Sequence, residues 1–174
     1  MDVRPFAYMK WAKDLVGSRR YDLACSGVPS APLPPQKDPA ANRVVPVGDG
    51  DPVVEGLIAD RYGVPPDHVF FLPGSTLGNY VLLSLLVDRG DRVLVESPAY
   101  ENLPGLVRLL GAEPVPLTRR AADGWSVDPD EVEAAFASGI RTAFLTDLHN
   151  PTGTRLPPET IEAIRASAGR HGAR

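Results

Sequence analysis

Short apolar segments alternate with helical patterns through most of this 174-residue chain. The four apolar segments are residues 68–72, 92–96, 114–117 and 142–146. Between them, residues 75–87 and 103–110 carry apolar side chains at the three- and four-residue spacing of a helix. Strands that alternate with helices of this length form βαβ units in a largely parallel sheet. We therefore expect an α/β fold, with a largely parallel sheet and flanking helices.

Residues with known helix-end preferences indicate where several helices begin and end. Asp51 followed by a proline favours a helix start and Gly63 favours an end, so we expect a helix over residues 52–62. Residues 128–131, Asp-Pro-Asp-Glu, resemble a capping box and predict another helix start. A last helix is expected near residues 158–170.

The first fifty residues differ in character from the rest. Residues 6–16 predict an amphipathic helix, and the six prolines in residues 29–46 indicate an extended arm. We therefore predict two regions. One is an N-terminal helix with a proline-rich arm, residues 1–50, and the other is the α/β region, residues 51–174.

Composition argues against several classes of function. The formal net charge is −4 and no face rich in Lys and Arg is evident, which argues against a nucleic-acid partner. Arg119 and Arg120 are expected on the solvated surface. The longest apolar stretch, residues 81–87, is too short to cross a bilayer, and no secretory signal is evident. The three histidines lack metal-ligand spacing. We expect a cytoplasmic protein with neither a membrane partner nor a metal site.

One candidate binding loop joins the first apolar segment to the helix that follows it. Ligands of open α/β sheets bind beyond the carboxyl ends of the strands, where this loop is expected. Gly74, Ser75 and Thr76 stand at the helix start, where backbone amides and hydroxyl groups can hold a phosphate. An ordinary helix cap is the alternative interpretation of the same residues.

A second candidate loop is residues 149–153, His-Asn-Pro-Thr-Gly. The proline keeps Asn150 extended, so that a neutral carboxamide is presented at the end of a buried strand. A helix-entry turn is the alternative. Tyr100 follows another strand on the same side of the sheet, where its ring could stack on a planar ligand or belong to the core.

In this order, the segments resemble class I and II aminotransferases, which are fold-type-I enzymes that depend on pyridoxal 5'-phosphate. The resemblance extends from about residue 21 to residue 171. The matching segments are residues 61–65, 73–76, 90–100, 110–113 and 149–153. The resemblance implies that the α/β region is an incomplete large domain of the fold-type-I transferase fold, which binds pyridoxal phosphate.

The resemblance also implies roles for six residues. The turn at Gly74, Ser75 and Thr76 would hold the cofactor phosphate. Tyr100 would stack on the pyridine ring, and Asn150 would hydrogen-bond its phenolic oxygen. The remaining position, Gly27, would lie near the substrate carboxylate.

The positions of the lysines affect the expected activity. The family uses a lysine that binds the cofactor covalently and moves the substrate's α-proton, and it follows the Asn-Pro-Thr-Gly turn. In this chain no lysine follows Lys37. We therefore expect the N-terminal portion of an aminotransferase, inactive alone and with no catalytic residue of its own. The full-length parent would transfer an amino group between an amino acid and a 2-oxo acid in a biosynthetic process, as a homodimer.

Two other classes of protein remain open. One is a noncatalytic cofactor-binding or regulatory module that uses the aminotransferase fold. The other is a different α/β nucleotide-binding enzyme, although the spacing of Gly74 and Gly78 matches neither a phosphate-binding P-loop nor a dinucleotide fingerprint.

Overall fold

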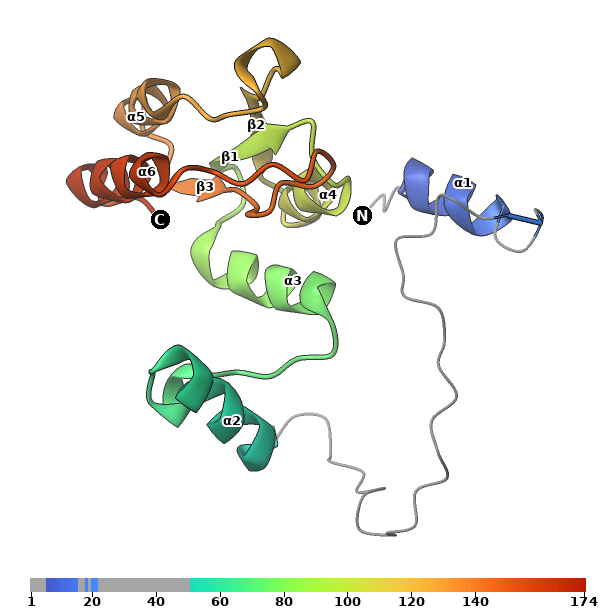
Figure 1. Cartoon of the computed structure of the whole chain (residues 1–174). Helices are drawn as coiled ribbons and strands as arrows, with labels where there is room; N and C mark the ends of the chain where they lie inside the picture. The colour runs from blue at the N-terminus through green and yellow to red at the C-terminus, as the bar shows by residue number, and fades with distance from the viewer. Residues whose placement is uncertain (1–5, 16–17, 19, 22–50) are drawn as a thin grey trace, which may run out of the picture. The chain divides into compact units, whose positions relative to one another are not determined.

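The computed structural model describes residues 6–15, 18, 20–21 and 51–174 (Figure 1). The chain divides into two compact units. One unit is residues 15–78, and the other combines residues 1–14 with residues 79–174. The predicted division after residue 50 stays a prediction.

The sheet belongs to the larger unit and has three strands, all parallel, in the order β2-β1-β3. Strand β1 (Arg92–Ser97) is central, between β2 (Glu113–Thr118) and β3 (Thr142–Phe144). The register pairs Val93 with Pro114 on one side and with Thr142 on the other. The predicted α/β class with a parallel sheet is confirmed.

The two prolines of β2 fit its place at the edge of the sheet. The Glu113 amide donates to the Asp91 carbonyl at 2.8 Å, next to β1. Because backbone N–H groups alternate in direction along a strand, the nitrogens of Pro114 and Pro116 face away from β1. No strand within the described residues pairs with β2 on that side, so no ladder hydrogen bond there needs the missing N–H.

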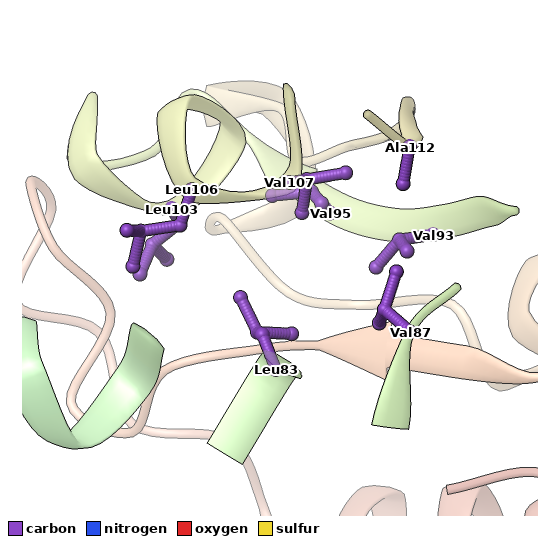
Figure 2. Packing of buried hydrophobic residues seen from close by; sticks show 8 residues of the cluster. All are labelled: Leu83, Val87, Val93, Val95, Leu103, Leu106, Val107 and Ala112. Carbon is purple, nitrogen blue, oxygen red and sulfur yellow. The ribbon is translucent and has the colours of Figure 1, made fainter. Parts of the chain in front are cut away.

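Helices cover both faces of this sheet. Helices α3 (Ser75–Leu86) and α4 (Asn102–Leu109) supply residues to one face, and α5 (Pro129–Ala137) and α6 (Pro158–His171) cover the other. The first core cluster, shown in Figure 2, is Leu83, Val87, Val93, Val95, Leu103, Leu106, Val107 and Ala112. The second is Leu94, Leu117, Val127, Val132, Phe136, Ile140 and Leu156. Successive residues of β1 thus enter opposite cores, as the two-residue period of a strand requires.

Several helix ends agree with the expected caps. Helix α2 (Pro52–Tyr62) begins at the predicted residue, with the Asp51 carboxylate accepting the Val53 amide at 3.0 Å. It ends at Gly63, whose φ is 65°.

Helix α1 (Ala7–Leu15) has no buried residue, and the Tyr8 amide donates to the Glu101 carboxylate at 3.2 Å.

The prediction of a strand at residues 68–72 is wrong. The chain instead forms a short 3₁₀ helix, η2 (Pro66–His68), and the residues between it and α3 pair with no strand within the described part of the chain. Phe70 and Phe71 remain 66% and 51% exposed. A strand needs backbone partners on a neighbouring strand, and the apolar pattern alone could not show whether one was present.

The outer edge of β3 carries one further ladder contact. The Arg174 amide donates to the Arg141 carbonyl at 2.9 Å, and the Ala143 amide donates to the Arg174 carbonyl at 2.8 Å. This alternation is that of a parallel pair. Arg174 therefore occupies the position of a fourth parallel strand next to β3.

The remaining helical element is η3 (Ala121–Asp123), which lies between β2 and α5. None of the described helices has both the length and the apolar character needed to cross a bilayer.

Candidate functional site

A buried polar cluster lies just beyond the carboxyl ends of the three strands. Strand alternation places Glu96 on the same face as Leu94, and Arg119 on the same face as Leu117. Both charged residues are only 2% exposed, and His149 is 1% exposed. The core cluster of this face is thus continued by charged side chains at the end of the sheet where ligands of parallel sheets bind.

Glu96 and Arg119 form an ion pair inside the protein. The Arg119 Nη1 donates to Glu96 Oε2 at 2.9 Å, and its Nε donates to the Trp125 carbonyl at 2.5 Å. The Nη2 atom is buried and has no partner in the described part of the chain. Burying two charges is costly unless they are paired in good geometry, as they are here.

The expectation that Arg119 lies on the solvated surface is therefore wrong, whereas Arg120 is exposed as predicted. Arg119 follows Leu117 by two residues and so shares its buried face. This alternation is the sequence signal that could have placed Arg119 on the buried face. Its partner could not be read from it, because Glu96 stands opposite Leu117 in the register and Arg119 follows two residues later.

The second oxygen of Glu96 holds the segment that follows β3. Glu96 Oε1 accepts the Thr146 amide at 3.0 Å and also accepts the Thr146 hydroxyl. The same hydroxyl oxygen accepts the Asn150 amide at 3.3 Å. The Glu96 carboxylate is thus linked to the backbone of Asn150 through one side chain.

The His149 ring connects the loop after β3 to the loop after β1. Its Nε2 lies 2.8 Å from the Pro98 carbonyl oxygen, which can only accept, so Nε2 donates. Its Nδ1 is 2.7 Å from the Thr152 hydroxyl, and Nε2 is 3.8 Å from Glu96 Oε2. The imidazole is thereby fixed on both sides.

Two of the predicted site residues are neighbours at this edge of the sheet. The Tyr100 amide donates to the Asn150 carbonyl at 3.1 Å. Tyr100 is half-buried and Asn150 is exposed, so both side chains are open to a ligand. The turn is closed by the Gly153 amide, which donates to the His149 carbonyl at 2.7 Å with a φ of 73° at Gly153.

The other predicted site residues are not part of the larger unit. Gly74, Ser75 and Thr76 belong to the smaller unit. Gly74 has a φ of 86°, and its carbonyl accepts the Gly78 amide at 3.2 Å, so α3 begins directly after it. Ser75 and Thr76 form the exposed first turn of α3. Gly27 falls outside the described residues.

The described residues contain no group of three or more His, Cys, Asp or Glu side chains arranged to hold a metal ion. The site residues that are open at the carboxyl end of the sheet are the Asn150 amide and the Tyr100 phenol. These two groups suit an uncharged hydrogen-bonding and stacking role toward an organic ligand.

Comparison with known proteins identifies the family. Residues 34–174 match the family model for aminotransferase class I and II. The chain belongs to this aminotransferase family.

Curated relatives agree with the assignment. This aminotransferase-family chain is 33% identical over 113 residues to the arginine–pyruvate transaminase of Pseudomonas aeruginosa, a match that covers 62% of the chain and 29% of the relative. It is 26% identical over 159 residues to the aspartate/prephenate aminotransferase of Thermus thermophilus, covering 84% of the chain and 41% of the relative. The chain therefore spans less than half the length of these relatives.

A solved structure shows the same fold. The alanine aminotransferase of Pyrococcus furiosus superposes with a TM-score of 0.67 at 26% identity, covering 71% of this chain and 33% of that one. The described sheet and helices thus correspond to part of the fold-type-I aminotransferase fold.

Proposed function

We propose that this chain is the part of a pyridoxal-phosphate-dependent aminotransferase that holds the cofactor. The observation that carries the proposal is the pairing of Tyr100 with Asn150, through a 3.1 Å backbone hydrogen bond, at the carboxyl end of a parallel sheet. Family membership supports the choice of cofactor. Parallel sheets bind their ligands at this end.

Each of the two units offers groups that suit one part of a flat, phosphorylated aromatic ring. The exposed Asn150 carboxamide can hydrogen-bond the phenolic oxygen of the ring, and the half-buried Tyr100 can stack on its face. Gly74, Ser75 and Thr76 form the exposed start of a 12-residue helix, where the positive end of the helix dipole favours a phosphate. Gly27 would stand near the substrate carboxylate.

Pyridoxal phosphate, when bound, supplies the electron sink for chemistry at the α-carbon of an amino acid. The contribution of this chain is to orient the ring and to hold its phosphate. Asn150 offers a neutral donor to the phenolic oxygen, which favours the ionised form of that oxygen. Tyr100 would cover one face of the ring and exclude water from it.

Catalysis of amino transfer requires a lysine, and this chain has none after Lys37. Of the earlier lysines, Lys10 lies on α1 and pairs with Asp14 at 3.2 Å on the exposed surface. The chain alone is thus proposed to be inactive. The whole enzyme would be a cytoplasmic homodimer that acts on an amino acid and a 2-oxo acid in a biosynthetic process.

A titration of the purified chain with pyridoxal phosphate, followed by the absorbance and fluorescence of the cofactor, tests the proposed site. Loss of ring stacking in Tyr100→Ala should weaken binding by about threefold to tenfold. Loss of a hydrogen bond in Asn150→Ala should weaken it by about fivefold. Tyr62→Ala is the matched control, because Tyr62 is 73% exposed and is not one of the proposed site residues. Equal affinity for all four proteins would contradict the assignment.

A second measurement separates catalysis from binding. With an amino acid and a 2-oxo acid present, the chain with cofactor should give no amino transfer, and borohydride should leave no cofactor attached to the protein. Cofactor binding without turnover would also fit the noncatalytic module. Turnover, or cofactor trapped on a lysine, would overturn the proposed inactivity.

A further inference from the structure

We infer that Glu96 is a positioning residue for the cofactor site, which fixes the loops that carry Asn150 and Tyr100 without contacting the ligand. The expected effect on cofactor binding rests on the proposed function. The contacts that support the positioning role do not depend on any ligand. The Glu96 side chain is fully buried.

The Glu96 carboxylate meets three hydrogen-bond donors. Oε2 accepts Arg119 Nη1 at 2.9 Å, and Oε1 accepts both the amide and the hydroxyl of Thr146. An ionised carboxylate is an acceptor only, and it can accept at both oxygens. A glutamine at this position would place its NH₂ group against a donor in either orientation, against Arg119 in one and against Thr146 in the other.

The Thr146 hydroxyl links Glu96 to the backbone of Asn150. Because the hydroxyl donates its single hydrogen to Glu96, its oxygen is left to accept, and it accepts the Asn150 amide at 3.3 Å. The Asn150 carbonyl in turn accepts the Tyr100 amide at 3.1 Å. One continuous chain of hydrogen bonds therefore connects the buried carboxylate to both proposed ring-binding residues.

A second link holds the same two loops together. His149 donates from Nε2 to the Pro98 carbonyl, which belongs to the loop that carries Tyr100. Glu96 Oε2 lies 3.8 Å from this nitrogen and favours a ring hydrogen on it. Loops held in their binding geometry before the ligand arrives lose less conformational entropy on binding. Removal of the Glu96 charge should therefore weaken cofactor binding through loop mobility.

Amide hydrogen exchange by NMR on the full chain tests this directly. In Glu96→Gln, the Tyr100 and Asn150 amides should exchange at least about tenfold faster than in the unsubstituted chain. The amides of Val95 and Val107, in the core, should change much less. Pyridoxal phosphate affinity should fall in the same variant.

Glu133→Gln is the matched control. Glu133 also accepts from three side chains, Ser167, Arg170 and His171, but these lie on α6, away from the loops. This variant should leave the exchange of Tyr100 and Asn150 unchanged. If the site amides of Tyr100 and Asn150 and the core amides of Val95 and Val107 all exchange faster by a common factor in Glu96→Gln, Glu96 has a role in general stability only. That result would overturn the inference.

Thr146→Val tests the link even if Glu96→Gln does not fold, because it removes the hydroxyl and keeps the backbone donor. The Asn150 amide should exchange faster in Thr146→Val and recover in Thr146→Ser, which restores the hydroxyl. Unchanged exchange in Thr146→Val would overturn the inference. Failure of the unsubstituted chain to bind pyridoxal phosphate would instead reject the proposed function, and the exchange data would still decide the role of Glu96.

Discussion

Single aspartates determine where two helices of this chain begin. Asp51 accepts the Val53 amide at 3.0 Å, and Asp128 accepts the Asp130 amide at 2.9 Å. Each aspartate stands before a proline in the first helical position, where the missing N–H would have had no partner. Asp51 thereby satisfies two of the amides that the first turn leaves open, since it also accepts the Val54 amide, and Asp128 satisfies one.

Replacement of Asp128 should measure this effect. Asp128→Ala should lower the free energy of unfolding by about 1 kcal/mol, because the Asp130 amide loses its acceptor. Asp128→Asn should lower the free energy of unfolding much less, since asparagine is an equally good cap. Urea denaturation followed by circular dichroism gives both values. Equal stability of the alanine and asparagine variants would contradict a capping role.

The candidate site also depends on residues whose environment was not evident from their type. Asn150 and Tyr100 could be selected from the sequence because each stands in a short motif after a strand. Glu96 and Arg119 are 23 residues apart, and their pairing follows from the register of β1 with β2. The alternation with Leu117 indicates the face on which Arg119 lies, but it does not indicate which carboxylate Arg119 meets there.

Among the elements, α5 and α6 are joined by one carboxylate. Glu133 on α5 accepts Ser167 Oγ at 2.5 Å, Arg170 Nη2 at 2.6 Å and His171 Nε2 at 2.7 Å, all from α6. The hydrogen bonds from Ser167, His171 and Arg170 lower the pKa of Glu133 from 4.5 to about 2. The ionised form is therefore favoured in the folded protein.

The sign of the resulting pH dependence follows from this lowered pKa. A carboxyl group whose pKa falls on folding stabilises the protein fully above 4.5, and this contribution is lost as the pH falls toward about 2. The stability difference between the unsubstituted chain and Glu133→Gln should be constant above about pH 5 and shrink below it. Thermal unfolding across this range measures the difference. A difference that stays constant down to about pH 3 would show that the charge is not responsible.

At the scale of the whole molecule, the two units differ in how many of their described residues are buried. Among the described residues of the smaller unit, only Ala59 is buried. In the larger unit, β1 has core on both faces and paired strands on both edges. Local opening is easiest where few apolar contacts must be broken.

Hydrogen exchange should separate the units clearly. Amides of β1 should exchange only when most of the larger unit unfolds, because this strand is paired on both sides and buried on both faces. Amides of α2 should therefore exchange at least about a thousandfold faster than those of β1. Mass spectrometry of peptides from residues 52–62 and 92–97 measures both. Similar protection of the two peptides would show that the smaller unit is stabilised beyond its own buried residues.

Local patterns in the sequence were enough to predict the parallel sheet and the start of α2 at Pro52. These two features depend on residues a few positions apart, because caps and strand alternation act over one or two turns of chain. The aminotransferase family was indicated instead by the order of five segments between residues 61 and 153. Only the tertiary structure decided that Arg119 is buried against Glu96 and that residues 68–72 do not form a strand. Both outcomes depend on which backbone lies alongside, and that is set by strand register over long separations.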